Sequence, residues 1–477
     1  MASNLSNQNY QMTSEVAVKV AVRVRPLNSR EKLHQHQPCV RLSSETNQLV
    51  IGKDKVFTFD YVLAPKTSQS DLYQSCVHQL VQSIFDGYNS TVFAYGQTGS
   101  GKTHTISGSS DDYGIIPRAV EAMFQTINSK QESQRDYLVK VNFIEIYKEE
   151  LKDLLDSSEK DLHIREDESG NTIIYGANEV VCSSLEQVMA CFESGTLLRH
   201  TGTTQMNEQS SRSHSVFTVS IEQRWTDDNV KVTSVRDSSV YELKQMAMAA
   251  AATQPKNTCY LGAKFHFVDL AGSERVHRTG NVGDRFKESI HINSGLLALG
   301  NVISALSSAD NSAKKKSVHI PYRDSKITRI LKDSLGGNSN TLMICCISPS
   351  SCNLDESINA LKYATRARYI KNKPIVNMDP EQQKFVEMQS EIQALREELS
   401  RQRTFISEAN LATTTNDQDL IAIQQKLEQT QNEADVYKKL VKEAYNRFKQ
   451  FDQLLACQNS SAMITKLTDE WLQIFEA

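Results

Sequence analysis

The chain has 477 residues, of which 39% are hydrophobic and 23% are charged, so it is long enough to bury a substantial core. Its formal net charge of −4 argues against a general nucleic-acid binder, and no apolar run approaches the length of a membrane span. We therefore predict no nucleic-acid partner and no membrane insertion. The cysteines form no Cys-x-x-Cys motif, which indicates reduced thiols of a cytoplasmic protein.

Strand and helix patterns alternate along most of the chain. Residues 1–14 are polar and are predicted to form a disordered N-terminal arm, with a short strand near 11–14 as the alternative. Valine then recurs at every second position over 16–24 until Pro26, which is the period of a β-strand. Further strands are predicted at 55–59, 92–95, 137–147, 216–223, 264–270 and 341–347. Helices are predicted at 70–85, 117–127, 185–196, 286–306 and 354–369. This order predicts an α/β fold with a central mixed, mostly parallel sheet flanked by helices.

Two regions depart from this alternation. Residues 223–262 are irregular apart from one apolar piece at 246–252, so we expect a long surface insertion there. After Pro380 the pattern becomes helical, with a heptad seam at Phe385, Met388, Ile392, Leu395 and Leu399. The seam predicts a short coiled-coil neck over 381–403 and a homodimer through 385–399. An amphipathic helix packed on its own domain stays open as the alternative. A linker at 404–417 and helical segments over 418–477 complete the chain.

The glycine-rich stretch 96–103 carries the clearest chemical signal. The fixed positions of the P-loop pattern are held by Gly96, Gly101, Lys102 and Thr103. Such a loop directs backbone N–H groups at phosphate, while Lys102 would reach the β and γ phosphates and Thr103 would ligate Mg²⁺. The alternative is a glycine-rich turn with a chance lysine. The nucleotide-binding residues predicted here are Gly96, Gln97, Thr98, Gly99, Ser100, Gly101, Lys102, Thr103 and His104.

Two further polar stretches match the other needs of a nucleotide hydrolase, which must sense the γ phosphate, hold Mg²⁺ from a second side and position water. Residues 207–214 are rich in hydroxyl groups, include Arg212 and lead into a predicted strand. Asp269 follows the apolar part of another predicted strand, which ends at Val268, where a second metal-holding carboxylate is expected, and Glu274 lies five residues further on. Taken alone, Arg212 and Glu274 are more simply two solvated surface charges.

These two stretches resemble switch I (Asn-x-x-Ser-Ser-Arg-Ser-His) and switch II (Asp-Leu-Ala-Gly-Ser-Glu) of the kinesin motor family. The resemblance covers residues 16–377, with further matches at 23–26, 93–95, 114–118, 299–306, 319–326 and 335–338. Residues 295–297, with 165–167 and 201–207, are similar to the kinesin-4 class, especially its cilium- and Hedgehog-linked branch. The resemblance implies a P-loop NTPase motor domain over 15–369.

The resemblance also implies chemical roles. ATP and Mg²⁺ are the implied cofactors, with Thr103 and Ser211 ligating the metal and Asp269 holding it through water. The Gly272 N–H would donate to the γ phosphate, and Arg212 and Glu274 would form an ion pair that closes the site. The implied catalytic residues are Ser210, Ser211, Arg212, Gly272 and Glu274. The implied adenine-side residues are Arg23, Arg25 and Pro26, although without the motif the two arginines would simply occupy the exposed face of a strand.

The implied partner is the microtubule, contacted by a helix at about 284–306 and a basic stretch at 314–326. Residues 370–380 resemble the neck linker, with Asn377 at the position of a docking asparagine, and this order of segments implies plus-end-directed force. Ser294 stands where many relatives carry a basic residue. Two functions therefore stay open: a moving, microtubule-stimulated ATP hydrolase, and a microtubule-tip regulator with slow turnover. No Asn/Thr-Lys-x-Asp motif supports a GTPase. The expected location is the cytoplasm, on the microtubule cytoskeleton, with the cilium as a further compartment.

Overall fold

The computed structural model describes residues 15–43, 46–130, 135–156, 158, 160–167, 170–201, 211–226, 258–274, 284–309, 319–378, 398–402 and 425–432. The chain divides into two units, residues 1–387 and 388–477. The described part of the second unit is helical. The predicted N-terminal arm, most of the heptad seam and the linker at 404–417 lie outside the described residues. Within the described ranges, no helix combines the length and apolarity that a membrane span requires.

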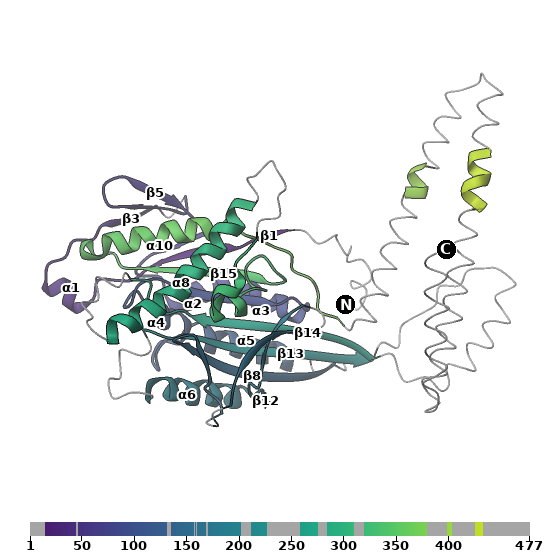
Figure 1. Ribbon diagram of the computed structural model, residues 1–477, viewed down its shortest axis with the longest axis horizontal. Coiled ribbons are helices and arrows are strands. Elements are labelled where there is room, and N and C mark those ends of the chain that lie inside the picture. Colours follow the sequence, from purple (N-terminus) through teal and green to yellow (C-terminus); the bar gives the residue numbers. More distant parts are fainter. Residues whose placement is uncertain are drawn as a thin grey trace, which may run out of the picture. The chain divides into compact units, whose positions relative to one another are not determined.

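A central mixed sheet organises the first unit (Figure 1). Its strands lie in the order β12-β8-β13-β14-β7-β15-β2-β6, and β9 pairs with β8. The strands are β2 Lys19–Val24, β6 Tyr61–Leu63, β7 Ser90–Tyr95, β8 Arg135–Tyr147, β9 Glu150–Asp153, β12 Val180–Cys182, β13 His214–Thr226, β14 Thr258–Asp269 and β15 Asn340–Ile347. Neighbouring strands are parallel from β14 to β6 and antiparallel from β12 to β14. The predicted mixed sheet is confirmed.

The parallel half of the sheet is the more deeply buried half. All six residues of β7 are buried, because β7 lies between β14 and β15 and both faces of the sheet are covered. Val20, Ala21 and Val22 of β2 are buried for the same reason. Parallel strands end at a common edge of the sheet, and Asp269 at the end of β14 is in register with Ala94 of β7. The loops that follow these two strands are therefore neighbours.

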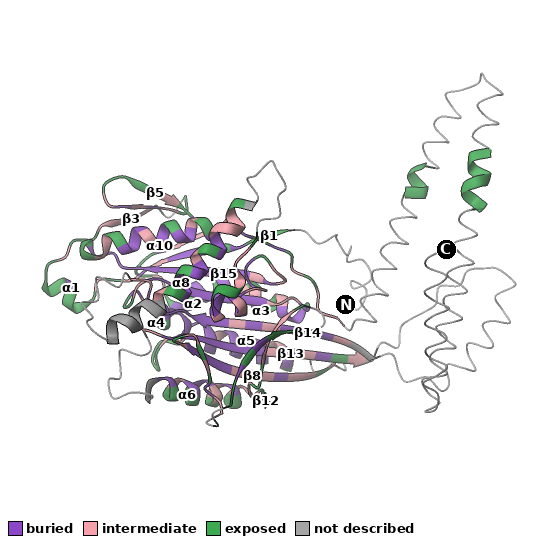
Figure 2. Cartoon of the chain, viewed as in Figure 1, coloured by how far each residue is buried: buried purple, intermediate pink, exposed green. Residues whose placement is uncertain are grey.

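Helices cover both faces of the sheet (Figures 1 and 2). One face packs against α3 His78–Phe85, α5 Ile115–Ser129 and α6 Leu185–Thr201. The other packs against α8 Asp284–Ala309, α9 Lys326–Ile330 and α10 Leu354–Ala367. In α5 the buried residues Ile116, Val120 and Met123 recur at helical spacing, so their side chains form one apolar stripe toward the sheet. The predicted flanking helices are confirmed.

The hairpin formed by β13 and β14 is longer than predicted. Its pairing continues to Thr226 and Thr258, so both ends of the predicted insertion at 223–262 belong to strands. The structure corrects these bounds to 227–257 at most, and that stretch, with its apolar piece at 246–252, lies outside the described residues. The added strand residues do not show the apolar alternation of a half-buried strand. They are held by cation–aromatic contacts. The Arg135 guanidinium lies over the Trp225 ring, at 4.4 Å from its centroid.

Other elements differ from their predicted form. The strand predicted at 16–24 is two strands: β1 Val16–Ala17 pairs with β16 Lys371–Asn372, and β2 starts at Lys19. The helix predicted at 70–85 consists of α2 Gln69–Leu72, a π-helical turn at Tyr73–Val77, and α3. The strand predicted at 55–59 is β5 Lys55–Thr58. Elements not predicted are α1 Ser29–Leu33, β3 Val40–Ser43, β4 Gln48–Ile51, β10 His163–Glu166, β11 Thr172–Tyr175 and the 3-10 turns Tyr322–Asp324 and Ser351–Asn353, besides β6, β9, β12, β16 and α9. Most are too short to show a periodic pattern.

Candidate functional site

The glycine-rich stretch connects β7 to the short helix α4 Lys102–Ile106, as the P-loop pattern requires. Gly96 has φ +150°, and a Cβ there would collide with the Cys346 carbonyl and the Ser100 hydroxyl. The backbone can therefore pass at this point only as glycine. Gly99 and Gly101 also have positive φ, at +75° and +101°. The predicted strand, loop and helix are thus present in the predicted order.

Lys102 is a buried cation at the centre of the loop. Its ammonium group donates to the carbonyl oxygens of Gly96, at 2.9 Å, and Gln97, at 3.0 Å. Burial lowers the pKa of Lys102, and the nearby carboxylates of Asp269 and Glu274 oppose that shift. A buried ammonium group is best stabilised by negative charge, which is what a phosphate group supplies. This arrangement fits the predicted contact of Lys102 with nucleotide phosphates.

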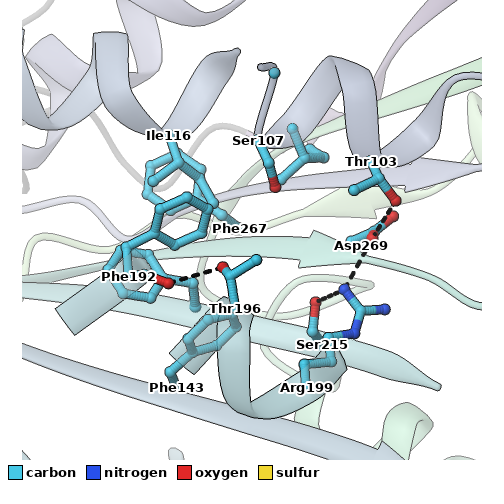
Figure 3. A pocket seen from close by; sticks show the side chains of 13 residues that line it. Thr103, Ser107, Ile116, Phe143, Phe192, Thr196, Arg199, Ser215, Phe267 and Asp269 are labelled. Carbon is cyan, nitrogen blue, oxygen red and sulfur yellow. Dashed lines mark hydrogen bonds and ion pairs between the residues drawn. The ribbon is translucent and has the colours of Figure 1, made fainter. Parts of the chain in front are cut away.

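The carboxylate of Asp269 faces α4 across the edge of the sheet. Its Oδ2 accepts from the Thr103 hydroxyl at 2.8 Å and pairs with Arg199 Nη1 at 3.1 Å (Figure 3). Its Oδ1 is buried and has no hydrogen-bond partner among the residues that the structure describes. An unpaired carboxylate oxygen beside a hydroxyl is a donor set that Mg²⁺ prefers. Thr103 and Asp269 therefore fit the predicted metal site, and Mg²⁺ would complete it together with phosphate oxygens.

Arg199, in the last turn of α6, is a site residue that sequence reasoning missed. Its Nη2 donates to the Ser213 carbonyl at 2.9 Å, and its Nη1 donates to the Ser215 hydroxyl at 2.8 Å. The side chains of Arg199 and Asp269 are only 6% and 3% exposed. A single arginine in a helical pattern carries no signal that separates such a buried ion pair from an ordinary solvated charge. Only the packing of α6 against the antiparallel half of the sheet, with Phe192 against Phe217 of β13, brings it to Asp269.

The two switch stretches are bonded directly to each other. The Gly272 N–H donates to the Ser211 carbonyl at 2.8 Å. The Ala271 N–H donates to Nδ1 of His214 at 3.0 Å. Burial and the Arg199 charge lower the pKa of His214 to about 3, so the ring is neutral with its proton on Nε2. If one stretch moves, either these hydrogen bonds break or the other stretch moves with it.

Glu274 and the Gly272 N–H bond other protein groups in this structure than the partners predicted for them. The Glu274 carboxylate accepts from the Thr98 N–H at 2.8 Å and the Thr98 hydroxyl at 2.5 Å, so it faces the P-loop instead of forming the predicted ion pair with Arg212. The Gly272 N–H, predicted to serve the γ phosphate, bonds Ser211. The reason is proximity: a Cβ on Gly272 would collide with Thr98 and Glu274, so this backbone is already in contact with the loop. Ser210 lies outside the described residues.

The predicted adenine-side residues lie beside the same loop. Arg23 Nη1 donates to the Gln69 side-chain oxygen and the Thr105 hydroxyl, both at 2.8 Å. Gln69 also lies 3.2 Å from Nδ1 of His104. Arg25 bonds the Gly99 carbonyl, and Pro26 adjoins it in the chain. The structure therefore gathers the predicted residues around one loop, and their contact with adenine stays a prediction.

A cavity of about 140 Å³ lies behind the site. Asp269, Arg199 and Ser215 form its polar end, and the rings of Phe143, Phe192 and Phe267 line the remainder (Figure 3). Within the described residues, no group of three His, Cys, Asp or Glu side chains could hold a metal ion. A divalent metal at this site would therefore depend on Asp269, on hydroxyl groups and on the phosphates themselves.

A second cavity, of about 310 Å³, is lined by basic side chains. Its charged and titratable lining consists of Glu166, His319, Tyr322, Arg323, Arg329 and Lys332. Lys332 pairs with Glu166 at 2.9 Å, which leaves a surplus of positive charge. Arg323 belongs to the predicted microtubule stretch 314–326, whereas residues 310–318, with the predicted lysines 314–316, lie outside the described residues.

The segment after α10 lies along the core. The Asn377 backbone N–H and side-chain Nδ2 both donate to the Gly87 carbonyl, at 3.0 and 2.9 Å. The Gly262 N–H donates to the Asn377 carbonyl at 3.0 Å, next to a bridge between Leu261 and Met378. The asparagine singled out by its position in the sequence is therefore bonded to both α3's carboxyl end and β14 in this structure.

The fold and the site together define a P-loop α/β domain with two switch stretches. The sequence matches the family model of the kinesin motor domain over residues 23–370, so the chain belongs to the kinesin motor domain family. It is 51% identical to the kinesin-like protein KIF27 of Homo sapiens over 90% of this chain and 30% of that protein. It is 48% identical to kif7 of Danio rerio, over 82% of this chain and 27% of that protein.

A plant relative and two solved structures agree with this assignment. KIN-4A of Arabidopsis thaliana is 44% identical over 81% of this chain and 38% of that protein, which confirms the predicted similarity to the kinesin-4 class. The structure of a fast kinesin has a TM-score of 0.64 at 37% identity, covering 76% of this chain and 94% of that one. A KIF14 dimer with AMP-PNP in complex with a microtubule has a TM-score of 0.65 at 36% identity, covering 76% and 97%. The chain spans well under half the length of its curated relatives.

Proposed function

We propose that this chain hydrolyses Mg-ATP in a cycle coupled to microtubule binding and to plus-end-directed movement. The observation that carries the proposal is the convergence of Lys102, Thr103 and Asp269 at the carboxyl edge of β7 and β14. There a buried cation, a hydroxyl and an unpaired carboxylate oxygen meet beside a glycine-rich loop. This combination suits the β and γ phosphates with a divalent cation.

The residues of the chain would divide the work as follows. Lys102 would exchange its bonds to two loop carbonyls for phosphate oxygens, which relieves the cost of burying its charge. Thr103 and Asp269, with Ser211, would hold Mg²⁺, whose charge offsets the negative charge of the phosphates. Arg199 would keep Asp269 ionised and oriented. Glu274 would turn from Thr98 toward Arg212 and orient the water that attacks.

Coupling to the microtubule would use the bonds between the two switch stretches. Gly272 and Ala271 are bonded to Ser211 and His214, so a change at the γ phosphate would shift the start of α8 with them. The basic cavity around Arg323 and Lys332 adjoins the turn Tyr322–Asp324, which contacts α8. Its positive charge suits it to the acidic surface of tubulin. The similar KIF14 structure, in complex with a microtubule, supports this assignment.

The test is steady-state ATP turnover of the 477-residue chain with and without stabilised microtubules. We expect turnover to rise by two or more orders of magnitude on adding microtubules, and surface-gliding assays would then give the direction. Turnover that is absent both with and without microtubules would contradict the proposal. Lys102→Ala is the control that shows the measured turnover belongs to this chain.

A second candidate function is a microtubule-tip regulator with slow turnover and little movement. Ser294, on α8, is exposed and places no positive charge on the helix expected to face tubulin. Tight microtubule binding with turnover that microtubules barely change would favour this candidate. Ser294→Lys should then strengthen binding and raise stimulation. In either case we expect the chain on the microtubule cytoskeleton, including that of the cilium, and expect a homodimer through residues 385–399.

A further inference from the structure

Arg25 holds the P-loop from outside its motif. Its Nε donates to the Gly99 carbonyl at 2.7 Å, and its two terminal nitrogens bind the two oxygens of the Glu31 carboxylate, at 2.6 and 2.7 Å. The Arg25 and Glu31 side chains are 16% and 7% exposed. A bidentate pair of this kind fixes the plane of the guanidinium group. The direction of the Nε–H toward Gly99 is therefore set by Glu31.

Glu31 is itself held from three directions. The Asn28 N–H donates to Oε2 at 2.9 Å, which closes the capping box of α1. The Ser348 hydroxyl and the Asn353 Nδ2 both donate to Oε1, at 3.3 Å. Hydrogen bonding and charge from Arg25 lower the pKa of Glu31 to about 2, so the carboxylate is ionised at physiological pH. The carboxylate therefore joins α1, the loop after β15 and the P-loop.

Gly99 needs such a restraint because packing does not supply one. A Cβ built on Gly99 would have no atom within 4 Å, and its φ of +75° is a conformation open to glycine. The carbonyls of Gly96 and Gln97, by contrast, are held by Lys102. The bond from Arg25 thus fixes the P-loop backbone at Gly99. The N–H groups of this loop are the ones proposed to bind phosphate.

We propose that Glu31 is a positioning residue for nucleotide binding, acting through Arg25 to hold the P-loop turn at Gly99. The inference rests on the proposed nucleotide function and adds to it a residue outside the P-loop and both switches. Pre-organising the loop lowers the entropy lost when a ligand orders it, so Glu31 should act on affinity for ATP and not on the chemical step.

The test compares Glu31→Gln with the wild-type chain. Glutamine keeps the size of the side chain but removes its charge and turns one acceptor into a donor facing Arg25. We expect the Kd for a fluorescent ATP analogue and the KM for ATP to rise about tenfold, with kcat at saturating ATP unchanged. In a double-mutant cycle, adding Glu31→Gln to Arg25→Met should weaken binding no further than Arg25→Met alone.

Two control variants separate positioning from stability. Asn28→Ala removes the side-chain cap of α1 but leaves the Glu31–Arg25 pair, so it should lower the unfolding midpoint and leave the Kd unchanged. Glu222→Gln breaks a similarly short ion pair to Lys140, on the far half of the sheet, and should also leave the Kd unchanged. A wild-type Kd in Glu31→Gln, or an equal loss in Asn28→Ala, would overturn the inference alone. Failure of the wild-type chain to bind the analogue would reject the proposed function, and this inference with it.

Discussion

The two halves of the central sheet differ in what stands at the ends of their strands. In the parallel half β2 and β7 have six residues each, and the loops after β7 and β14 carry Lys102, Thr103 and Asp269. In the antiparallel half β8 and β13 have thirteen residues each and continue as hairpins beyond the core. The buried ion pair lies at the first edge, whereas the Lys140–Glu222 pair of the second is 27% and 17% exposed.

The difference shows that the chemistry of this domain depends on strand ends more than on strand faces. Parallel strands must end at a common edge, so short loops bring polar side chains from distant parts of the chain together. Antiparallel strands spread their polar residues along a half-solvated face. β14 belongs to both halves, and Arg199 bonds to both, since Ser215 lies on β13 and Asp269 ends β14.

The largest expected effect is on nucleotide affinity, and it should differ between a lysine of the parallel half and a lysine of the antiparallel half. Lys102→Ala should reduce affinity for a fluorescent ATP analogue by at least about a hundredfold, because it removes the buried cation from the loop. Lys140→Ala should leave that affinity unchanged, because its ion pair is remote from the loop. Equilibrium titration of both variants measures the contrast. An equal loss in the two variants would show that the halves do not divide chemistry from scaffold.

The two halves should also differ in how much the loss of an ion pair lowers the free energy of unfolding. Arg199→Ala leaves the 3% exposed Asp269 carboxylate without its cation, and we expect the free energy of unfolding to fall by about 3–5 kcal/mol. Lys140→Ala breaks a partly exposed pair and should cost less than about 1 kcal/mol. Denaturant unfolding at neutral pH measures both. Similar losses would mean that burial does not distinguish the two pairs.

The buried histidines His214 and His266 of β13 and β14 should make stability depend on acid. Burial lowers both pKa values to about 3, below the ordinary value of 6.5. The unfolded chain therefore binds more protons than the folded chain between these values, so stability is full above pH 6.5 and falls as the pH drops toward 3. The slope should be about 1.4 kcal/mol per pH unit for each histidine. His266→Gln should remove the contribution of one histidine to the slope of unfolding free energy against pH over pH 4–6. An unchanged slope would contradict the prediction.

The smallest effect concerns the segment docked on the boundary strand β14. Asn377→Ala removes the side-chain bonds to the Gly87 carbonyl, to Asn89 and from Asn338, and we expect docking to weaken by about 1 kcal/mol. Hydrogen exchange of the Gly262 amide, which donates to the Asn377 carbonyl, should become roughly fivefold faster. Lys373→Ala is the control, because its ion pair with Glu15 is 63% and 46% exposed. Equal exchange in both variants would show that the asparagine side chain does not hold the segment.

Much of the fold and the core of the site followed from local patterns. Phosphate binding needs a continuous run of backbone N–H groups with a lysine and a hydroxyl at fixed spacing, so residues 96–103 were recognisable without tertiary information. Asp269 was recognisable because it directly follows the apolar run that ends at Val268, and it is the last residue of β14. The order of strands and helices likewise predicted a mixed sheet with two covered faces. These features depend on neighbours in the chain, which a sequence states directly.

What the sequence could not show depends on partners far away in the chain. Arg199 and Glu31 have ordinary helical surroundings. Arg199 meets Asp269, 70 positions away, and the Arg25 side chain that Glu31 holds bonds Gly99, 74 positions away. The length of the β13–β14 hairpin was hidden because cation–aromatic contacts take the place of apolar alternation. Glu274 likewise faces Thr98, since two donors of one P-loop residue lie within reach of its carboxylate. Local pattern thus determined which chemical groups this protein carries. Packing alone decided which of these groups meet, because buried charges are stabilised by the partners that the fold brings within hydrogen-bond distance.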